Sequence, residues 1–435
     1  MFLPTAGLCD DPPVDSNNFV IDTYNGPQLG SIRTVSLSGA YTGIAEQGQG
    51  IMYNPASVAQ RVWFSKDMFG YDAGYAYLKP GLIAGDDIDF DNDGDESFNY
   101  GDFLIGVIFA SLRINKAGIG ADVRIMKFTL GGKDGIEEKM DVLLGHADLA
   151  FGYNLARGLI VLGGGLRLGF MSVNVKGMEQ GNALTYLSMG PIAGILFRLR
   201  NVPLRIGLSV GFPHNWLQGR WTDGVSECVN DKGEPVKAIC QGGDCTNRRI
   251  IIPDAIAHPW SIRLGFAYYV GKQNWNEAWS LEKRKYQYSN KVMTKKGKYK
   301  WSTWASQYDL ERGDIDRRFL LIALDVEVVG GLRDGIGIEG FLDQKWERSG
   351  ETPTVSIHLG AETEVWADYL VLRWGGYAEP SRFKRTDYRI HATMGFDLKM
   401  FSICWGSSRL NVRGSTVFDV AEGYFNAGFS VGFWK

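Results

Sequence analysis

Long stretches of the chain alternate apolar and polar residues with a period of two. From 204 to 212 the even-numbered residues are all apolar, whereas the odd-numbered ones are Arg, Gly, Ser and Gly. The same alternation runs through 388–400 and 424–434. A period of two places alternate side chains on opposite faces of a β-strand, so the pattern predicts many amphipathic strands.

Fourteen such strands can be placed, an even number. They lie near 62–78, 102–113, 117–131, 143–155, 158–174, 184–199, 203–213, 258–270, 317–329, 353–366, 368–378, 387–403, 409–418 and 424–434. Some connections are short, such as Arg157-Gly158 and Ala367-Asp368. A further alternating piece at 335–342 would make the count odd, so we assign it to an external loop.

Two classes of protein share this alternation. A soluble all-β protein turns its apolar faces inward, whereas a transmembrane β-barrel turns them toward lipid. The predicted strands, about 10 to 16 residues long, can cross a bilayer at a tilt. Trp260, Trp366, Tyr369 and Phe433 gather at strand ends, as aromatic girdles do. We therefore favour the barrel, and the net charge of −3 gives no support to a nucleic-acid partner.

One stretch near the start is built from small residues. Residues 30–56 hold closely spaced Ser, Gly and Ala, then a Gly-Gln-Gly break and Asn54-Pro55, which stops any helix at Tyr53. This stretch resembles the N-terminal signature of FadL-type outer-membrane proteins, in which a small-residue helix and an Asn-Pro-Ala turn form a hatch inside a barrel. The candidate hatch residues are Gly39, Ala40, Tyr41, Asn54, Pro55 and Ala56.

Two later hairpins extend the resemblance. The pair 356–364 and 370–381 resembles the family's late hairpin, with an inward Glu, an inward Arg and a Glu-Pro-Ser exit. The pair 189–196 and 203–210 is similar to its central hairpin. The resemblance implies an all-β, 14-stranded antiparallel barrel over 61–435, plugged by an N-terminal tail and hatch over 1–60.

The same resemblance implies a place in the bacterial outer membrane. Residues 1–9 lack the basic and apolar regions of an export signal, so we expect the signal peptide to be absent from this chain or truncated. Lys435 departs from the pattern of such barrels, which usually end on an aromatic residue.

Charged residues on the polar phase of the strands are expected to face the lumen. Mixed-sign charges in a narrow lumen are costly unless they pair across the barrel or with the hatch. They either rigidify a plugged barrel or line a polar path beside the hatch. The set comprises Arg205, Arg263, Glu362, Glu364, Arg373, Arg389 and Asp397.

The loop 87–96 is a candidate cation site. Asp89, Asp91, Asp93 and Asp95 stand at alternate positions, and the sixth residue is Gly94, as at the start of an EF-hand loop. The bidentate Glu expected at the twelfth position is absent. We expect either Ca²⁺ or a solvated acidic loop here, and no other cofactor.

Three cysteines lie in 214–257, which we expect to be a large external loop. Cys228, Cys240 and Cys245 could hold zinc, but no His stands at ligand spacing. The expected compartment is oxidising, so one disulfide is favoured over a metal, with the pairing left open.

The segment 271–316 is rich in basic and aromatic residues. If the strands alternate in direction, it lies at the periplasmic end, where turns are normally short. It is either a docking element for a periplasmic or envelope protein or an ordinary external loop beside a miscounted strand. The candidate docking residues are Trp275, Trp279, Trp301 and Trp304.

Two functions remain in view. The five histidines are scattered and no catalytic constellation is present, so we do not expect an enzyme. As the resemblance implies, the first hypothesis is a transporter of hydrophobic, fatty-acid-like small molecules across the outer membrane. The alternative is a structural or secretion-associated barrel, as in PorV-like relatives, that docks proteins of an envelope complex. In both, outer-membrane lipid surrounds the barrel.

Overall fold

The structure is a computed structural model. It describes residues 11–60, 69–82, 88–94, 98–132, 139–175, 184–213, 219–221, 225–240, 249–271, 275–276, 292–293, 299–300, 319–383, 388–405 and 408–434. Within the described residues, no helix is both long enough and apolar enough to cross a membrane.

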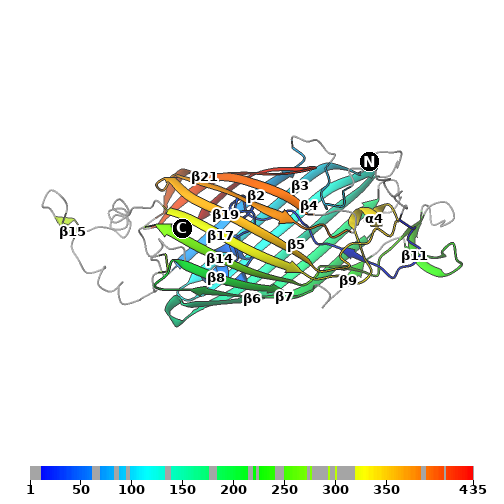
Figure 1. Cartoon of the computed structure of the whole chain (residues 1–435), viewed down its shortest axis with the longest axis horizontal. Helices are drawn as coiled ribbons and strands as arrows, with labels where there is room; N and C mark the ends of the chain where they lie inside the picture. Colours follow the sequence, from blue (N-terminus) through cyan, green and yellow to red (C-terminus); the bar gives the residue numbers. More distant parts are fainter. Residues whose placement is uncertain are drawn as a thin grey trace, which may run out of the picture.

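Fourteen antiparallel strands form a closed barrel, which confirms the predicted fold (Figure 1). The strands are β2 (Phe69–Pro80), β3 (Phe98–Ile114), β4 (Ala117–Gly132), β5 (Lys139–Leu155), β6 (Ile160–Val175), β7 (Leu184–Arg198), β8 (Leu204–Gly211), β14 (Ser261–Gly271), β17 (Phe319–Val329), β19 (Thr354–Trp366), β20 (Leu370–Glu379), β21 (Arg389–Trp405), β22 (Ser408–Ala421) and β23 (Tyr424–Trp434). The first strand begins at Phe69 rather than near 62, and 61–68 lie outside the described residues.

Each barrel strand pairs with its neighbours in chain order, and the first strand, β2, pairs with the last, β23. Short connections gather at one end, such as 115–116 between β3 and β4 and the 3₁₀ turn η3 (Ala156–Gly158) between β5 and β6. Long connections, such as 212–260 and 330–353, gather at the other. In outer-membrane barrels short turns face the periplasm, so we call these the periplasmic and external ends.

The burial pattern decides between a soluble protein and a membrane barrel. On β5, Leu149 and Phe151 are 51% and 58% exposed, whereas Asp148 is 0% exposed. On β21, Ile390 and Met394 face outward while His391 is buried. Apolar side chains thus cover the outside and charged ones the inside, which suits lipid around the barrel and rules out the soluble alternative.

The interior is occupied by the N-terminal segment. It carries α1 (Ile32–Ser36) and the 3₁₀ helices η1 (Gly48–Gly50) and η2 (Pro55–Ala59). Nearly all residues from 29 to 60 are buried; α1 packs against β20 to β23, and η2 against β4 to β7. We call 29–60 the hatch.

The hatch contains less helix than the sequence predicts. Ser31 caps α1 by accepting a 3.3 Å hydrogen bond from the backbone N–H of Thr34. The helix then ends early, because Ser38 and Gly39 take positive φ angles of 56° and 78°. Asn54 does not end a long helix; its side chain caps η2 by accepting from the N–H of Ala56 at 3.0 Å.

Glycines line the wall where the hatch backbone approaches it. A Cβ built on Gly163 of β6 would lie 2.1 Å from the backbone nitrogen of Ala56. One built on Gly207 of β8 would lie 2.0 Å from the carbonyl oxygen of Thr42. Only glycine leaves room for such contacts. This glycine belt comprises Gly118, Gly152, Gly163, Gly194, Gly207, Gly265, Gly360, Gly375 and Gly395.

The external end is covered by a cap built from the N-terminus and the long loops (Figure 1). The strand β1 (Val20–Asp22) lies parallel between β13 (Ala255–Ala257) and β18 (Gly335–Ile336). The cap also holds α4 (Ile338–Leu342), so the piece at 335–342 lies outside the barrel sheet, as predicted. Its other strands are β10 (Val225–Val229), β11 (Pro235–Cys240) and β12 (Arg249–Ile251), which form a small sheet. The short strand β9 (Gly219–Trp221) instead pairs with β7 and extends the barrel sheet.

The segment 272–318 leaves and re-enters the barrel at the periplasmic end, because β14 ends there and β17 begins there. The alternative of a miscounted strand is therefore wrong. Its described strands, β15 (Val292–Met293) and β16 (Tyr299–Lys300), form an antiparallel pair. Figure 1 shows β15 beyond the end of the barrel that carries the C-terminus.

Replacing Gly163 by alanine is expected to loosen the hatch, because the new Cβ overlaps the Pro55–Ala56 backbone. Overpacking of this kind costs about 1–3 kcal/mol. Gly164→Ala is the matched control, since its Cβ would meet nothing closer than 3.6 Å. The measurement is the temperature at which the purified barrel loses its folded mobility on a gel. Equal midpoints for the two variants would contradict a tight belt.

Candidate functional site

A chain of alternating charges crosses the lumen and passes through the hatch. In order across the lumen its members are Arg205, Glu46, Arg33, Glu362, Arg373 and Asp397. Successive nitrogen–oxygen distances are 2.8, 3.3, 2.8, 2.5 and 2.5 Å. We call this set the charge ladder. It joins β8 to β19, β20 and β21 through two hatch residues.

The charge ladder is almost entirely shielded from water. Its wall carboxylate Glu362 accepts two hydrogen bonds from Arg33, at 2.8 and 2.9 Å, and a third from Arg373. Charge-assisted, two-pronged pairs of this kind are the strong ones. The predicted lumen residues Arg205, Glu362, Arg373 and Asp397 therefore meet in one network. Arg33 and Glu46 carry no signal in the sequence, because they lie outside the strand pattern.

A second anchor holds the hatch backbone. The N–H groups of Tyr41 and Thr42 donate to Asp325 Oδ2 of β17 at 3.1 and 2.8 Å. Asn54 then donates to the carbonyl oxygens of Thr42 and of Ile195 on β7, both at 3.2 Å. The candidate hatch motif thus holds the turns of the hatch together and fastens them to two strands.

Trp275, one of the candidate docking residues, and its neighbour Asn276 pack into the periplasmic end of the barrel. Trp275 is 2% exposed, stacks on Tyr269 and lies beneath the guanidinium of Arg205, 3.6 Å from the ring centre. Asn276 donates to three carbonyls of the β7–β8 turn, those of Leu199, Val202 and Leu204. The prediction that Trp275 docks a partner is wrong, because its ring is buried within this chain. Trp279, Trp301 and Trp304 lie outside the described residues.

The remaining predicted lumen residues lie at other levels of the barrel. Arg263 pairs with Glu327 at 2.7 Å, and Arg389 pairs with Glu379 at 2.8 Å near the external end. Glu364 accepts a 2.6 Å hydrogen bond from the N–H of Asp368 in a periplasmic turn. The predicted set is therefore three separate groups beside the charge ladder.

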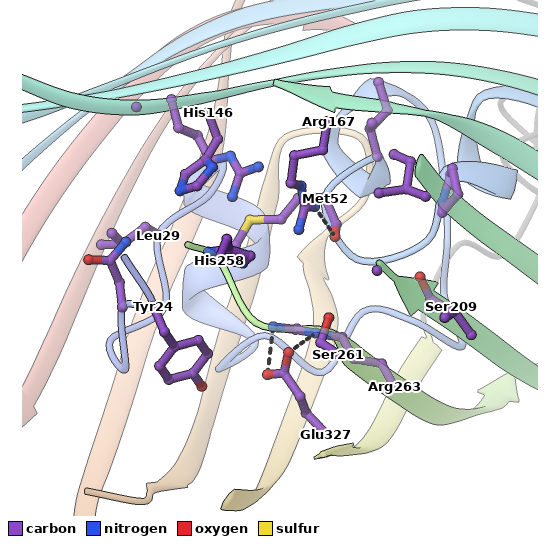
Figure 2. A pocket seen from close by; sticks show the side chains of 18 of the residues that line it. Tyr24, Leu29, Met52, His146, Arg167, Ser209, His258, Ser261, Arg263 and Glu327 are labelled. Atoms are coloured by element: carbon purple, nitrogen blue, oxygen red, sulfur yellow. Dashed lines mark hydrogen bonds and ion pairs between the residues drawn. The ribbon is translucent and has the colours of Figure 1, made fainter. Parts of the chain in front are cut away.

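An inner cavity lies between the hatch and the wall (Figure 2). Leu29 and Met52 of the hatch line it, together with Arg167, His146 and Arg263 of the wall. The space that admits the centre of a water molecule is about 60 Å³. That volume holds a few waters, whereas a cavity of about 150 Å³ is needed for a ring such as benzene.

An outer cavity lies nearer the cap, lined by Phe90, Tyr100, Phe128 and Leu144 among others. It shares Tyr24, Asn25 and Met126 with the inner cavity. The inner faces of β3 to β6 are apolar at this level. These buried side chains are Phe103, Ile105, Val107, Met126, Phe128, Leu130, Val142, Leu144, Met171 and Val173.

This apolar lining was missed in the sequence. Residues 103–110 read Phe-Leu-Ile-Gly-Val-Ile-Phe-Ala, with no polar phase, and so do not alternate. A strand that is apolar on both faces signals burial on both faces. The loss of alternation at 103–110 was therefore the sequence signal for an apolar inner wall.

The cap holds the predicted cation ligands and cysteines. One oxygen each of Asp89, Asp91 and Asp93 lie within 4.8 Å of one another, while Asp95 is outside the described residues. Cys240 is disulfide-bonded, and its Sγ lies 3.5 Å from that of Cys228, too far for a bond between those two. Cys245 lies outside the described residues.

Comparison with solved structures shows the fold. A CymD monoaromatic hydrocarbon channel matches with a TM-score of 0.52 and 11% identity, over 95% of this chain and 98% of that one. A Pseudomonas aeruginosa FadL homologue matches with a TM-score of 0.51 and 11% identity, over 96% and 99%. No protein-family model and no curated protein matches the chain. The chain therefore has the fold of FadL-type outer-membrane channels, as the resemblance implied.

Neutralising Glu362 in the charge ladder is expected to weaken the attachment of the hatch to the barrel wall. In Glu362→Gln, Arg33 and Arg373 lose their shared carboxylate, and breaking a buried pair from one side costs about 3–5 kcal/mol. The surface pair Arg348–Glu351 supplies the control Glu351→Gln, expected to change stability by about 0–1 kcal/mol. Limited proteolysis of residues 29–60 is the readout. Equal cleavage rates in both variants would refute the role of the ladder.

Proposed function

We propose that the protein is a FadL-like channel that admits small hydrophobic molecules across the outer membrane. The observation that carries this is a pair of neighbouring cavities between the cap and the hatch, each with apolar side chains in its lining. The outer cavity has aromatic and aliphatic walls, as sites for apolar ligands do. The two cavities share the lining residues Tyr24, Asn25 and Met126, so they lie next to each other.

The class of ligand follows from the lining. Both cavities mix apolar and charged side chains: the outer one includes Asp22, Asp91 and Arg382, and the inner one includes Arg124, Arg167 and Arg263. The arginines of the inner cavity are paired: Arg124 and Arg167 share Asp148, at 2.7 and 2.6 Å, and Arg263 holds Glu327. A small, largely apolar molecule suits such a surface better than a strongly charged one. One solved structure of the same fold is described as a monoaromatic hydrocarbon channel, which supports the same class.

The described state is closed. The inner cavity is too small for an aromatic ring, and the charge ladder holds the hatch below it. Passage of a small molecule therefore requires the hatch to move. The strength of the ion pairs in the charge ladder determines how often the hatch moves.

A second candidate function is a structural barrel that docks proteins of an envelope complex. It is favoured by the buried pairing of the ladder and by the Trp275–Asn276 plug, which together give a rigid, doubly closed lumen. A barrel that serves only as a docking platform has no need of neighbouring cavities with apolar side chains in their lining, so we place transport first.

Filling the inner cavity is expected to stop uptake. The test compares the uptake of radiolabelled toluene and oleate by Gram-negative cells that lack other channels of this fold. We expect wild type to raise uptake of one of them at least fivefold over empty cells. Met52→Trp, which fills the inner cavity, is expected to bring uptake back to the empty-cell rate.

Met394→Trp is the matched control, because Met394 is 62% exposed on the lipid face. It is expected to transport as wild type does. Uptake in wild type no higher than in empty cells would contradict a channel for either probe. A stable envelope complex recovered from those same cells would then support the docking function.

A further inference from the structure

The acidic loop between β2 and β3 has the dimensions of a cation site. One carboxylate oxygen from each of Asp89, Asp91 and Asp93 lies within 4.8 Å of the other two. Ca²⁺ binds oxygen at about 2.4 Å, so two ligands of one ion are at most about 4.8 Å apart. The three aspartates can therefore contact one ion together.

Two of these carboxylates have an oxygen without a hydrogen-bond partner among the described residues. Asp89 is 8% exposed; its Oδ2 accepts from the N–H of Gly94 at 3.2 Å, but its Oδ1 accepts nothing. The Oδ1 of Asp91 is likewise buried and unsatisfied. Buried acceptors of this kind are rare unless a cation or water satisfies them.

An independent observation comes from the opposite side of the cap. Glu339 of α4 is 2% exposed, and its Oε1 accepts a 2.5 Å hydrogen bond from Tyr100 while its Oε2 has no hydrogen-bond partner in the described part of the chain. The start of α4 touches the aspartate loop, because a Cβ on Gly337 would lie 3.7 Å from Asp91 Oδ2. A buried carboxylate far from the loop in sequence thus reaches the same acidic region, since Glu339 is repelled by the charge of Asp91.

Several carboxylates repel one another in this region. Asp91 lies close enough to Asp93, Glu347 and Asp89 for electrostatic repulsion, and Glu339 is repelled by Asp91 in turn. The cation Arg389 lies 3.6 Å from Asp89 but also holds Glu379 at 2.8 Å. One arginine is thus shared between two carboxylates, and a bound cation would offset the repulsion among the aspartates.

We propose that Asp89, Asp91 and Asp93 bind one Ca²⁺ ion and that Glu339 adds negative charge to the site from α4. Carboxylate oxygens on an irregular loop suit Ca²⁺, which accepts variable geometry, better than Mg²⁺, which demands a strict octahedron. The ion ties the β2–β3 loop to the loop that carries α4. The three ligands come from the loop that the sequence singled out, and Glu339 acts on it from α4. Asp91 also lines the outer cavity, but calcium binding is measured without reference to transport.

Calcium titration of the full chain tests this proposal. The purified barrel in detergent, freed of metal with EGTA, is titrated with CaCl₂ at pH 7.5 in a calorimeter. We expect one site with a dissociation constant on the order of 10⁻⁴–10⁻³ M, as in extracellular modules. Asp91→Asn is expected to weaken it at least tenfold, and Glu339→Gln by severalfold. Asp231→Asn, at an exposed carboxylate of the same cap, is the control and is expected to leave affinity unchanged.

Thermal stability separates loss of the site from loss of the fold. Without calcium, Asp91→Asn removes like-charge repulsion and is expected to melt at or above the wild-type temperature. Calcium is expected to raise the melting temperatures of wild type and of Asp231→Asn by more than that of Asp91→Asn, because an ion that binds the folded state stabilises it. No calcium-dependent rise in wild type, or an Asp91→Asn affinity within twofold of wild type, would overturn the proposal.

Discussion

The pairing of buried charges between the wall and the hatch is the constraint on which the rest of the interior depends. Arg205 and Glu362 lie deep in the lumen, and each finds an opposite charge on the hatch, in Glu46 and Arg33. A buried charge left without its partner costs several kcal/mol. The barrel wall is therefore complementary to the hatch in charge. Without the hatch, Arg205 and Glu362 would lose Glu46 and Arg33 as their partners.

The shape of the wall follows the same constraint. The ladder requires the hatch backbone to come close to many strands at once, and the glycine belt removes the Cβ atoms that would prevent this. Asp325 then receives two hatch N–H groups that would otherwise be buried without acceptors. Above this level the inner faces of β3 to β6 are apolar, and they form one side of the outer cavity.

The fold could be predicted from the sequence because alternation is local. A period of two shows each strand and which residues face inward, so fourteen strands and the inward phase of Glu362 and Arg373 followed directly. Partners could not be predicted, because they depend on register around the closed barrel and on the path of the hatch. Trp275 shows what the sequence could not predict. Its aromatic and basic sequence neighbours suggested a protein interface, whereas in the structure its ring packs against Arg205, which lies 70 residues earlier in the chain. Glu339 was missed for the same reason, since it meets the aspartate loop only in the folded cap.

Hydrogen exchange of the hatch in lipid nanodiscs tests the central claim most directly. If buried pairing holds the hatch against the wall, peptides covering Tyr41 and Thr42 exchange as slowly as those from the middle of β19. In Glu362→Gln the hatch peptides exchange faster while β19 stays protected. Hatch peptides that exchange in wild type as fast as the exposed loop around Asp231 would contradict the account.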